Sequence, residues 1–205
     1  EQLGIKHPIL LAPMAGVSTP LLAAEVSNQG ALGALGLGAN TVDSALQQIQ
    51  ETQVLTSRPF QLNFFCHEST ALNTESNTLW SQHLAAEFKK FGANPPKELK
   101  CIYPSFKDND DFLNLCLDTQ PKAVSFHFGI PHQYQIQKLK QAGIITLVSA
   151  TNLTEALAIE EAGIDIIVAQ GIEAGGHRGI FNAQIDGAIK TSDLVTLIKK
   201  HSSLP

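Results

Sequence analysis

The residues best suited to chemistry in this chain lie in one glycine-rich segment, residues 170–179, which reads QGIEAGGHRG. Its four glycines let a backbone approach a bulky ligand closely and offer N–H groups to it. Gln170 carries amide donors and a carbonyl acceptor, which suit the edge of a heteroaromatic ring. Histidine is the side chain suited to acid–base chemistry at neutral pH, so His177 can act as a base or carry a switchable positive charge. The pattern favours an active-site loop over a glycine-rich surface loop with an incidental histidine.

The elements that must position this segment are predicted from apolar runs that alternate with stretches of helical periodicity. Most runs are continuously apolar, which is typical of strands buried on both faces, as in parallel sheets. The predicted strands are residues 9–12, 32–35, 60–65, 123–128, 144–148 and 164–169. The predicted helices are residues 20–29, 42–55, 78–91, 112–117, 133–142, 153–162 and 192–200.

Local signals support these boundaries. Gly30, Gly143 and Gly163 each follow a predicted helix and precede a predicted strand, where glycine is favoured because it accepts a positive φ. Asn152, with Glu155 three residues later, resembles a capping box at the start of the next helix.

Alternating strands and helices leave two architectures, an open doubly wound sheet or a parallel (β/α)8 barrel. An open dinucleotide-binding sheet should carry GxGxxG after its first strand. Here that strand leads into PMAG at residues 13–16, and the glycines of residues 33–38 are spaced GxxGxG. The barrel is therefore favoured.

We expect residues 1–205 to form a single incomplete barrel domain. A barrel has eight strands in about 250 residues, and six strands are predicted here, so about six of eight βα units are expected. The missing units would include the loops after the last two strands, where barrels often bind phosphate. Residues 92–111, rich in Pro, Asn and Asp, are expected to form an irregular insertion in which residues 100–103 could add a lone strand.

Composition excludes several classes of function. The chain is 43% hydrophobic and 16% charged, as is ordinary for a globular protein, and its formal net charge of -5 argues against nucleic acid or an anionic membrane as partner. Its three cysteines form no CxxC pair, so neither a disulfide framework nor a metal site is expected, and reduced thiols fit the cytoplasm. No apolar run reaches the roughly 18 residues that cross a membrane. Residues 1–7 are too polar for a signal peptide.

Barrel active sites lie at the carboxyl ends of the strands, and this rule selects candidate residues without any comparison. After the predicted strands come Pro13, Met14, Ala15, Asn63, His127, Ser149, Gln170, Gly175, Gly176 and His177. His127 is either a substrate contact or a core histidine satisfied by a neighbour. Asn63 either bonds a ligand ring or closes a turn after its strand. Cys66 and His67 as a nucleophile–base pair are disfavoured, because adjacent side chains rarely face each other.

With these residues in view, the chain resembles the nitronate monooxygenases, formerly called 2-nitropropane dioxygenases, which are FMN-dependent barrels. Three segments carry the resemblance, in the family's order and across nearly the whole chain. They lie within residues 7–28 (HPILLAPMAGVSTPLLAAEVSN), 125–131 (SFHFGIP) and 169–179 (AQGIEAGGHRG). The third is the most specific, and the first is shared with wider FMN barrels.

The resemblance implies a role for each matching residue. The backbone of Pro13, Met14 and Ala15 would lie against the flavin, Asn63, Gln170, Gly175 and Gly176 would contact FMN, and His177 would be the catalytic histidine. His127 and Ser149 are candidate substrate contacts. The implied reaction is oxidative denitrification of an alkyl nitronate, typically propionate 3-nitronate, by O2. His177 would hold the nitronate anion or remove the α-proton of a neutral nitroalkane.

The resemblance also leaves alternatives. Family sequences continue into glycine-rich turns that bind the FMN phosphate, so these 205 residues alone would be expected to bind FMN weakly and to leave strand edges exposed. If these residues are part of a longer polypeptide, the assignment to the family is unaffected. An FMN-dependent NAD(P)H:quinone reductase or enoyl-acyl-carrier-protein reductase, and an inactive truncated barrel, stay open as alternatives.

Overall fold

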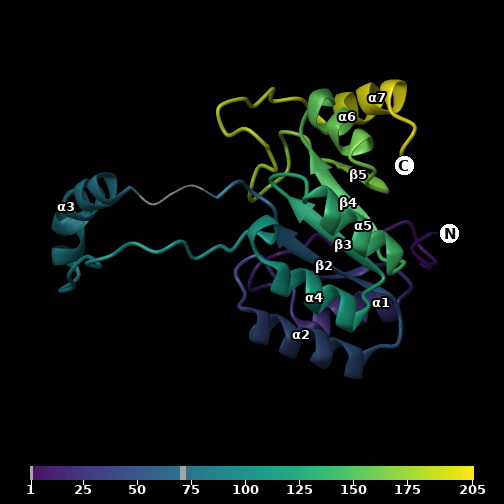
Figure 1. Cartoon of the computed structure of the whole chain (residues 1–205), viewed down its shortest axis with the longest axis horizontal. Coiled ribbons are helices and arrows are strands. Elements are labelled where there is room, and N and C mark those ends of the chain that lie inside the picture. The colour runs from purple at the N-terminus through teal and green to yellow at the C-terminus, as the bar shows by residue number, and fades with distance from the viewer. Residues whose placement is uncertain (1, 70–72) are drawn as a thin grey trace. The chain divides into compact units, whose positions relative to one another are not determined.

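The computed structural model describes residues 2–69 and 73–205 (Figure 1). Five strands of these residues form one parallel sheet in the order β1-β2-β3-β4-β5. The strands are β1 Gly33–Gly36, β2 Phe60–Phe65, β3 Ala123–His127, β4 Ile145–Ala150 and β5 Ile166–Ala169. The helices are α1 Pro20–Asn28, α2 Val42–Leu55, α3 Thr74–Lys90, the 3-10 helix η1 Phe106–Asp108, α4 Asp110–Thr119, α5 Gln133–Gln141, α6 Leu153–Glu161 and α7 Thr191–His201. The predicted parallel α/β class is confirmed.

The chain divides into two compact units. The first comprises Glu1–Glu68 and Tyr103–Pro205 and contains the whole sheet, and the second is Ser69–Ile102, which contains α3. Helix α3 buries none of its described residues. No helix among the described residues combines the length and the apolar character needed to cross a membrane. The assignment of residues 1–205 to a single domain stays a prediction.

The two faces of the sheet differ in polarity because side chains alternate along each strand. On β2, Phe60, Leu62 and Phe64 join the main core under the helices, where the Phe64 ring lies 5.0 Å from that of Phe112 in α4. The intervening Gln61 and Asn63 are also buried, but they face the opposite side of the sheet. Strand β2 therefore presents apolar side chains to the helices, and Gln61 and Asn63 to the opposite face of the sheet.

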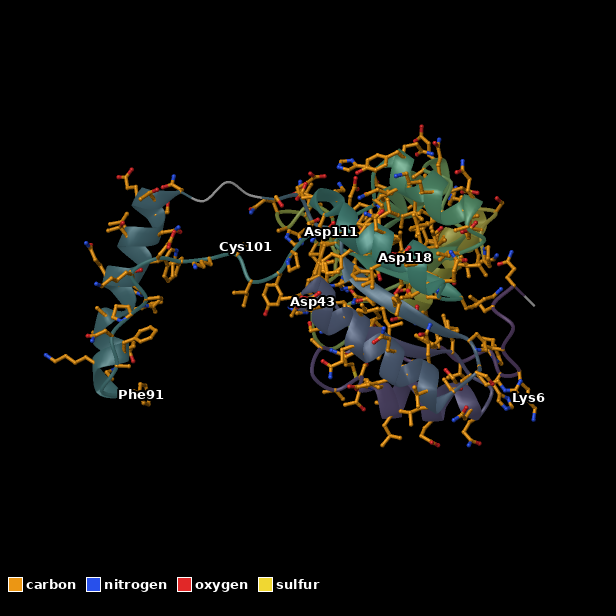
Figure 2. All side chains as sticks on the ribbon, turned by 60° about the horizontal axis from the view of Figure 1, so that its bottom comes forward. Lys6, Asp43, Phe91, Cys101, Asp111 and Asp118 are labelled. Atoms are coloured by element: carbon orange, nitrogen blue, oxygen red, sulfur yellow. The ribbon has the colours of Figure 1, made fainter. Side chains whose placement is uncertain are left out.

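Helix α4 shows how a helix is matched to this apolar face. Its buried residues are Phe112, Leu113, Leu115 and Cys116. Asp111 and Asp118 are exposed, and Figure 2 shows both on the side of α4 that faces away from the sheet. They are seven residues apart, which is two helical turns, so the helix has one polar and one apolar face.

Three predicted helix ends are confirmed. Gly30, Gly143 and Gly163 have φ of 88°, 73° and 80°, so each chain reversal uses the left-handed conformation that glycine accepts without strain. The predicted capping box is half formed: the Asn152 side chain accepts from the Glu155 N–H at 2.9 Å. The Glu155 carboxylate accepts from Thr151 instead of returning to the Asn152 N–H.

One predicted strand is wrong. Residues 9–12 form only an isolated parallel bridge, between Leu10 and Leu32. The apolar run implied burial on both faces, but Ile9 is 60% exposed and Leu10 is 38% exposed, so that burial is not realised. No strand occurs at residues 100–103 either.

Two helices are longer than predicted, because their first turns are polar and are set by caps. Helix α3 begins at Thr74 and not at residue 78, since the Asn73 side chain accepts from the Ser76 N–H at 2.9 Å. Asn109 caps α4 in the same way, accepting from the Asp111 N–H at 3.0 Å. Residues 92–105 are irregular and lead into η1 and the start of α4; their status as an insertion stays a prediction.

Helix α1 approaches β1 so closely that no side chain fits between them at Gly33. The Ser27 hydroxyl accepts from the Gly33 N–H at 3.1 Å and donates to the Pro59 carbonyl at 2.9 Å, which ties α1 to two neighbouring segments. A β-carbon at Gly33 would lie 2.0 Å from the Ala23 carbonyl oxygen, a backbone atom that cannot rotate away.

We therefore expect Gly33→Ala to reduce the free energy of unfolding by more than about 2 kcal/mol, because the added carbon forces α1 off the sheet. Gly187→Ala is the matched control. Its β-carbon would make only ordinary contacts, at 3.5 Å or more, so a change within about 0.5 kcal/mol is expected. Urea unfolding measures both variants, and equal stabilities would contradict the close approach.

Candidate active site

The candidate site lies at the carboxyl ends of the parallel strands, on the interior face. Strand register places Gly36 of β1 beside Asn63 of β2, and Asn63 beside Ser125 of β3. Phe65 and His127 form the next interior pair towards the carboxyl ends. Because parallel strands end at one edge, residues distant in sequence become neighbours there.

Asn63 lies inside β2, so the expectation that it follows its strand is wrong. The β-structure continues because Asn63, Phe64 and Phe65 all pair with β3. Its side-chain Nδ2 donates to the Ser125 hydroxyl at 3.0 Å and to the Ser125 carbonyl at 3.2 Å. Asn63 therefore closes no turn, and its amide is fixed on the interior face.

The backbone of Pro13, Met14 and Ala15 lies next to the end of β1. A β-carbon on Gly36 would come within 3.1 Å of the Met14 backbone and 3.2 Å of the Ala15 nitrogen, so this backbone passes close to β1 and would have to shift to admit a side chain. The Ser18 hydroxyl accepts from the Met14 N–H at 2.9 Å and fixes this turn. Since Gly36 neighbours Asn63, the structure brings these predicted residues together.

His127 and Ser149, the candidate substrate contacts, bond to each other. His127 Nδ1 lies 3.0 Å from the Ser149 hydroxyl oxygen, and Nε2 lies 3.4 Å from the His177 carbonyl oxygen. A carbonyl can only accept, so Nε2 carries the hydrogen and Ser149 donates to Nδ1. Burial lowers the pKa of His127, and the hydrogen bond with the His177 carbonyl partly opposes this. His127 is therefore a neutral, satisfied histidine that supports the neighbouring loop.

The loop after β5 is held by the Gln170 side chain. Nε2 donates to the His177 carbonyl at 2.9 Å, and Oε1 accepts from the Gly179 N–H at 2.7 Å. Gly179 packs directly on His127, since a β-carbon there would lie 2.7 Å from the imidazole Cε1. Gln170 thus spans the base of the loop and makes no further hydrogen bond through its second amide hydrogen among the described residues.

His177 is exposed at the tip of this arrangement and is flanked by aromatic rings. Its ring centroid lies 5.7 Å from that of Phe65 and 5.6 Å from that of Phe128, both in edge-to-face geometry. Phe128 has a φ of 73°, which costs a residue with a side chain about 1 kcal/mol or more. Backbone strain next to an exposed histidine is typical of a functional site.

Other candidates are not joined to this cluster. Gly175 and Gly176 are exposed, and a β-carbon on either would meet no atom within 4 Å, so their role in cofactor binding stays a prediction. Burial raises the pKa of the Cys66 thiol well above its usual value, which opposes a role as nucleophile. A separate open hollow of about 510 Å³ lies at the amino end of β2, and no predicted site residue lines it. Among the described residues no cluster of three or more His, Cys, Asp or Glu could hold a metal ion.

Three polar residues of the site were given no role in it from the sequence. Glu155 is buried and accepts from Thr151 through one oxygen and from the Phe181 N–H, at 3.0 Å, through the other. Arg178 and Asp186 form an ion pair across the loop. Glu155 was visible as a capping residue, and Arg178 as the neighbour of His177, but no pattern pairs either with its distant partner.

The lowered pKa of His127 predicts a pH dependence of stability. The unfolded chain has the ordinary histidine pKa of about 6.5 and takes up more protons than the folded state as the pH falls below that value, so folding is weakened there. We expect His127→Asn to remove this contribution. Urea unfolding of the full chain at about pH 7.5 and about pH 5.5 measures it, and an equal acid-induced loss in both proteins would contradict it.

Known proteins resemble this chain over nearly its whole length. The sequence model of the nitronate monooxygenase family matches residues 1–205. The nitronate monooxygenase of Paraburkholderia phytofirmans is 50% identical over 204 residues, which is 99% of this chain and 56% of that protein. That of Pseudomonas aeruginosa is 46% identical, over 99% of this chain and 58% of that protein. The chain thus spans somewhat more than half the length of these curated relatives.

Two solved structures also match nearly the whole chain. Nitroalkane oxidase of Streptomyces ansochromogenes is 37% identical and matches with a TM-score of 0.86, over 98% of this chain and 58% of that chain. FabK of Thermotoga maritima is 27% identical, with a TM-score of 0.72, over 100% of this chain and 50% of that chain. The predicted barrel-type fold is confirmed. This chain belongs to the nitronate monooxygenase family.

Proposed function

We propose that the protein to which this chain belongs carries out FMN-dependent oxidative denitrification of alkyl nitronates, of the propionate 3-nitronate type, with O2 as co-substrate. The observation that carries the proposal is the placement of His177. It is exposed at the carboxyl edge of the sheet, and its carbonyl is anchored by Gln170. The names of the relatives support the same reaction class.

The residues at this edge fit a flavin ring. The backbone of Met14 and Ala15 and the residue Asn63 both border Gly36, so a flavin ring lying on this backbone would have the Asn63 amide beside it. Gln170 keeps one amide hydrogen for a ring acceptor, and the side-chain Oδ1 of Asn63 receives no hydrogen bond from a described residue. Donors and acceptors on an apolar background are typical of cofactor sites. FMN, when bound, would supply the redox chemistry.

The chain's own residues would bind the substrate and handle its proton. His177, when protonated, would hold the nitronate anion by a charge-assisted hydrogen bond. As a neutral base it would remove the α-proton of a nitroalkane. The rings of Phe65 and Phe128 beside it would limit the orientations of the imidazole. His127 and Ser149 would act by supporting the loop, since their polar atoms already bond to each other and to the His177 carbonyl.

The similarity to FabK keeps a second candidate, an FMN-dependent NAD(P)H reductase. Flavin absorbance, followed anaerobically in the full-length protein, separates the two. A nitronate monooxygenase should be reduced by propionate 3-nitronate and should consume O2 when air is admitted. Bleaching of the flavin by NADH, with no reaction towards the nitronate, would favour the reductase and contradict the proposal.

His177→Asn should keep flavin binding and lower turnover of nitroalkane by on the order of 10²-fold or more, because the base is lost while Gln170 still holds the backbone carbonyl. His201→Asn is the control, since His201 is an exposed histidine at the end of α7. Steady-state O2 consumption measures both variants. Full activity of His177→Asn towards nitronate and nitroalkane would show that the assigned role is wrong.

A further inference from the structure

We propose that Arg178 and Asp186 form a positioning pair that holds the loop bearing His177 on the carboxyl end of β5. The pair makes no contact with the His177 ring, and it reaches the proposed cofactor edge only through Gln170, whose amide oxygen accepts from Arg178 Nη1 at 3.3 Å. It is therefore a positioning device and not part of the chemistry. The inference rests on the proposed function only in taking His177 as the reacting side chain. The pair itself is defined by contacts between residues of this chain.

Arg178 connects three parts of the loop at once. Its Nε and Nη2 donate to the two carboxylate oxygens of Asp186, at 3.1 and 3.0 Å. Its Nη1 donates to the Gly171 carbonyl at 2.7 Å and to the Gln170 carbonyl at 3.2 Å. This uses the planar fork of a guanidinium, which a lysine cannot reproduce.

Asp186 in turn orders the chain that follows. Its Oδ1 also accepts from the Ala188 N–H at 2.9 Å, and Ala188 has a positive φ of 48°. The ion pair is partly shielded, with 18% of the Arg178 side chain and 29% of the Asp186 side chain exposed. Such a pair is screened less than a fully exposed one, so it can hold two loop segments together.

His177 depends on this pair because the preceding residues cannot restrain it. Gly175 and Gly176 have no side chains and lie in open space, and Gly176 adopts a φ of 76°. The restraint must therefore come from the other side of His177. There Arg178 acts together with Gln170, which bonds the His177 carbonyl and the Gly179 N–H, and with His127, whose Nε2 lies 3.4 Å from the His177 carbonyl oxygen. Loss of the Arg178 contacts leaves the segment around His177 to the bonds of Gln170 and the longer contact of His127.

Arg178 is also unsuited to bind the substrate anion directly. All three guanidinium nitrogens are engaged with Asp186 and the two carbonyls. If Arg178 bound an anion through its charge, a lysine in its place would retain part of the function. If Arg178 acts through its planar guanidinium, a lysine would not. This difference separates a positioning role from substrate binding.

The test compares Arg178→Lys, Arg178→Gln, Asp186→Asn and the double variant Arg178→Gln/Asp186→Asn in the full-length flavin-loaded protein. With FMN held at saturation, kcat/KM for nitroalkane should fall about 10- to 100-fold in each single variant, as expected when a reacting group is misplaced. Arg178→Lys should not restore kcat/KM. The double variant should be no worse than the poorer single variant, because each single substitution already removes the interaction between Arg178 and Asp186.

Hydrogen exchange supplies a readout that does not need activity. Amides of residues 172–181 should exchange faster in Arg178→Gln and in Arg178→Lys, while amides of β3 and β4 keep their protection. If the wild type does not turn over nitronate, the proposed function fails, but this measurement still decides the pair. Unchanged exchange of residues 172–181 would overturn it.

Lys140→Gln is the matched control. Lys140 also donates to a backbone carbonyl, that of Gly163 at 2.6 Å, and pairs with a carboxylate, that of Asp165 at 3.3 Å. It belongs to α5 and lies outside the loop. Its removal should change neither exchange at residues 172–181 nor kcat/KM. If Arg178→Lys kept a kcat/KM near that of the wild type while Arg178→Gln was impaired, the proposal would be overturned, since positive charge alone would then suffice.

Discussion

The carboxamide of Gln170 is the group on which the geometry of the candidate site depends, because it bonds the loop after β5 at two points. Its Nε2 donates to the His177 carbonyl and its Oε1 accepts from the Gly179 N–H. A loop with four glycines has a large conformational entropy to lose and few side chains to pack. Polar contacts to its backbone must offset that cost. The Glu155 carboxylate adds a further contact beyond the loop, at the Phe181 N–H.

The register of the parallel sheet puts the supports of this loop in place. His127 ends β3, Ser149 lies near the end of β4, and Gln170 directly follows β5, so consecutive strands deliver consecutive supports to one edge. The buried Phe126 and Val148 face the helices, which fixes the orientation of both strands. A slip by one residue would turn His127 towards the helices and Phe126 towards the interior. The apolar core therefore determines which side chains face the site.

Patterns with a local cause were predictable, and contacts between distant segments were not. The bounds of α2 and the positive φ of Gly143 and Gly163 follow from periodicity and from the chemistry of helix ends. The strand predicted at residues 9–12 is wrong because an apolar sequence does not by itself determine burial, which depends on the segments that pack around it. Asn63 was expected after its strand, although β2 continues through it to Phe65. Arg178 and Asp186 are eight residues apart in an irregular segment, where no periodicity predicts which side chains meet.

Gln170 would have two roles in the proposed site, one towards the cofactor and one towards the loop that bears His177. From its chemistry alone it is a ligand for the edge of a ring, whereas the structure uses both ends of its amide to hold the loop. These roles are compatible, since a primary amide has two hydrogens and only one is committed. A ring acceptor bound to the second hydrogen would restrict the same side chain that anchors the His177 carbonyl. Cofactor binding and the order of the His177 loop would then be thermodynamically linked through one amide, and each would strengthen the other by the same free energy.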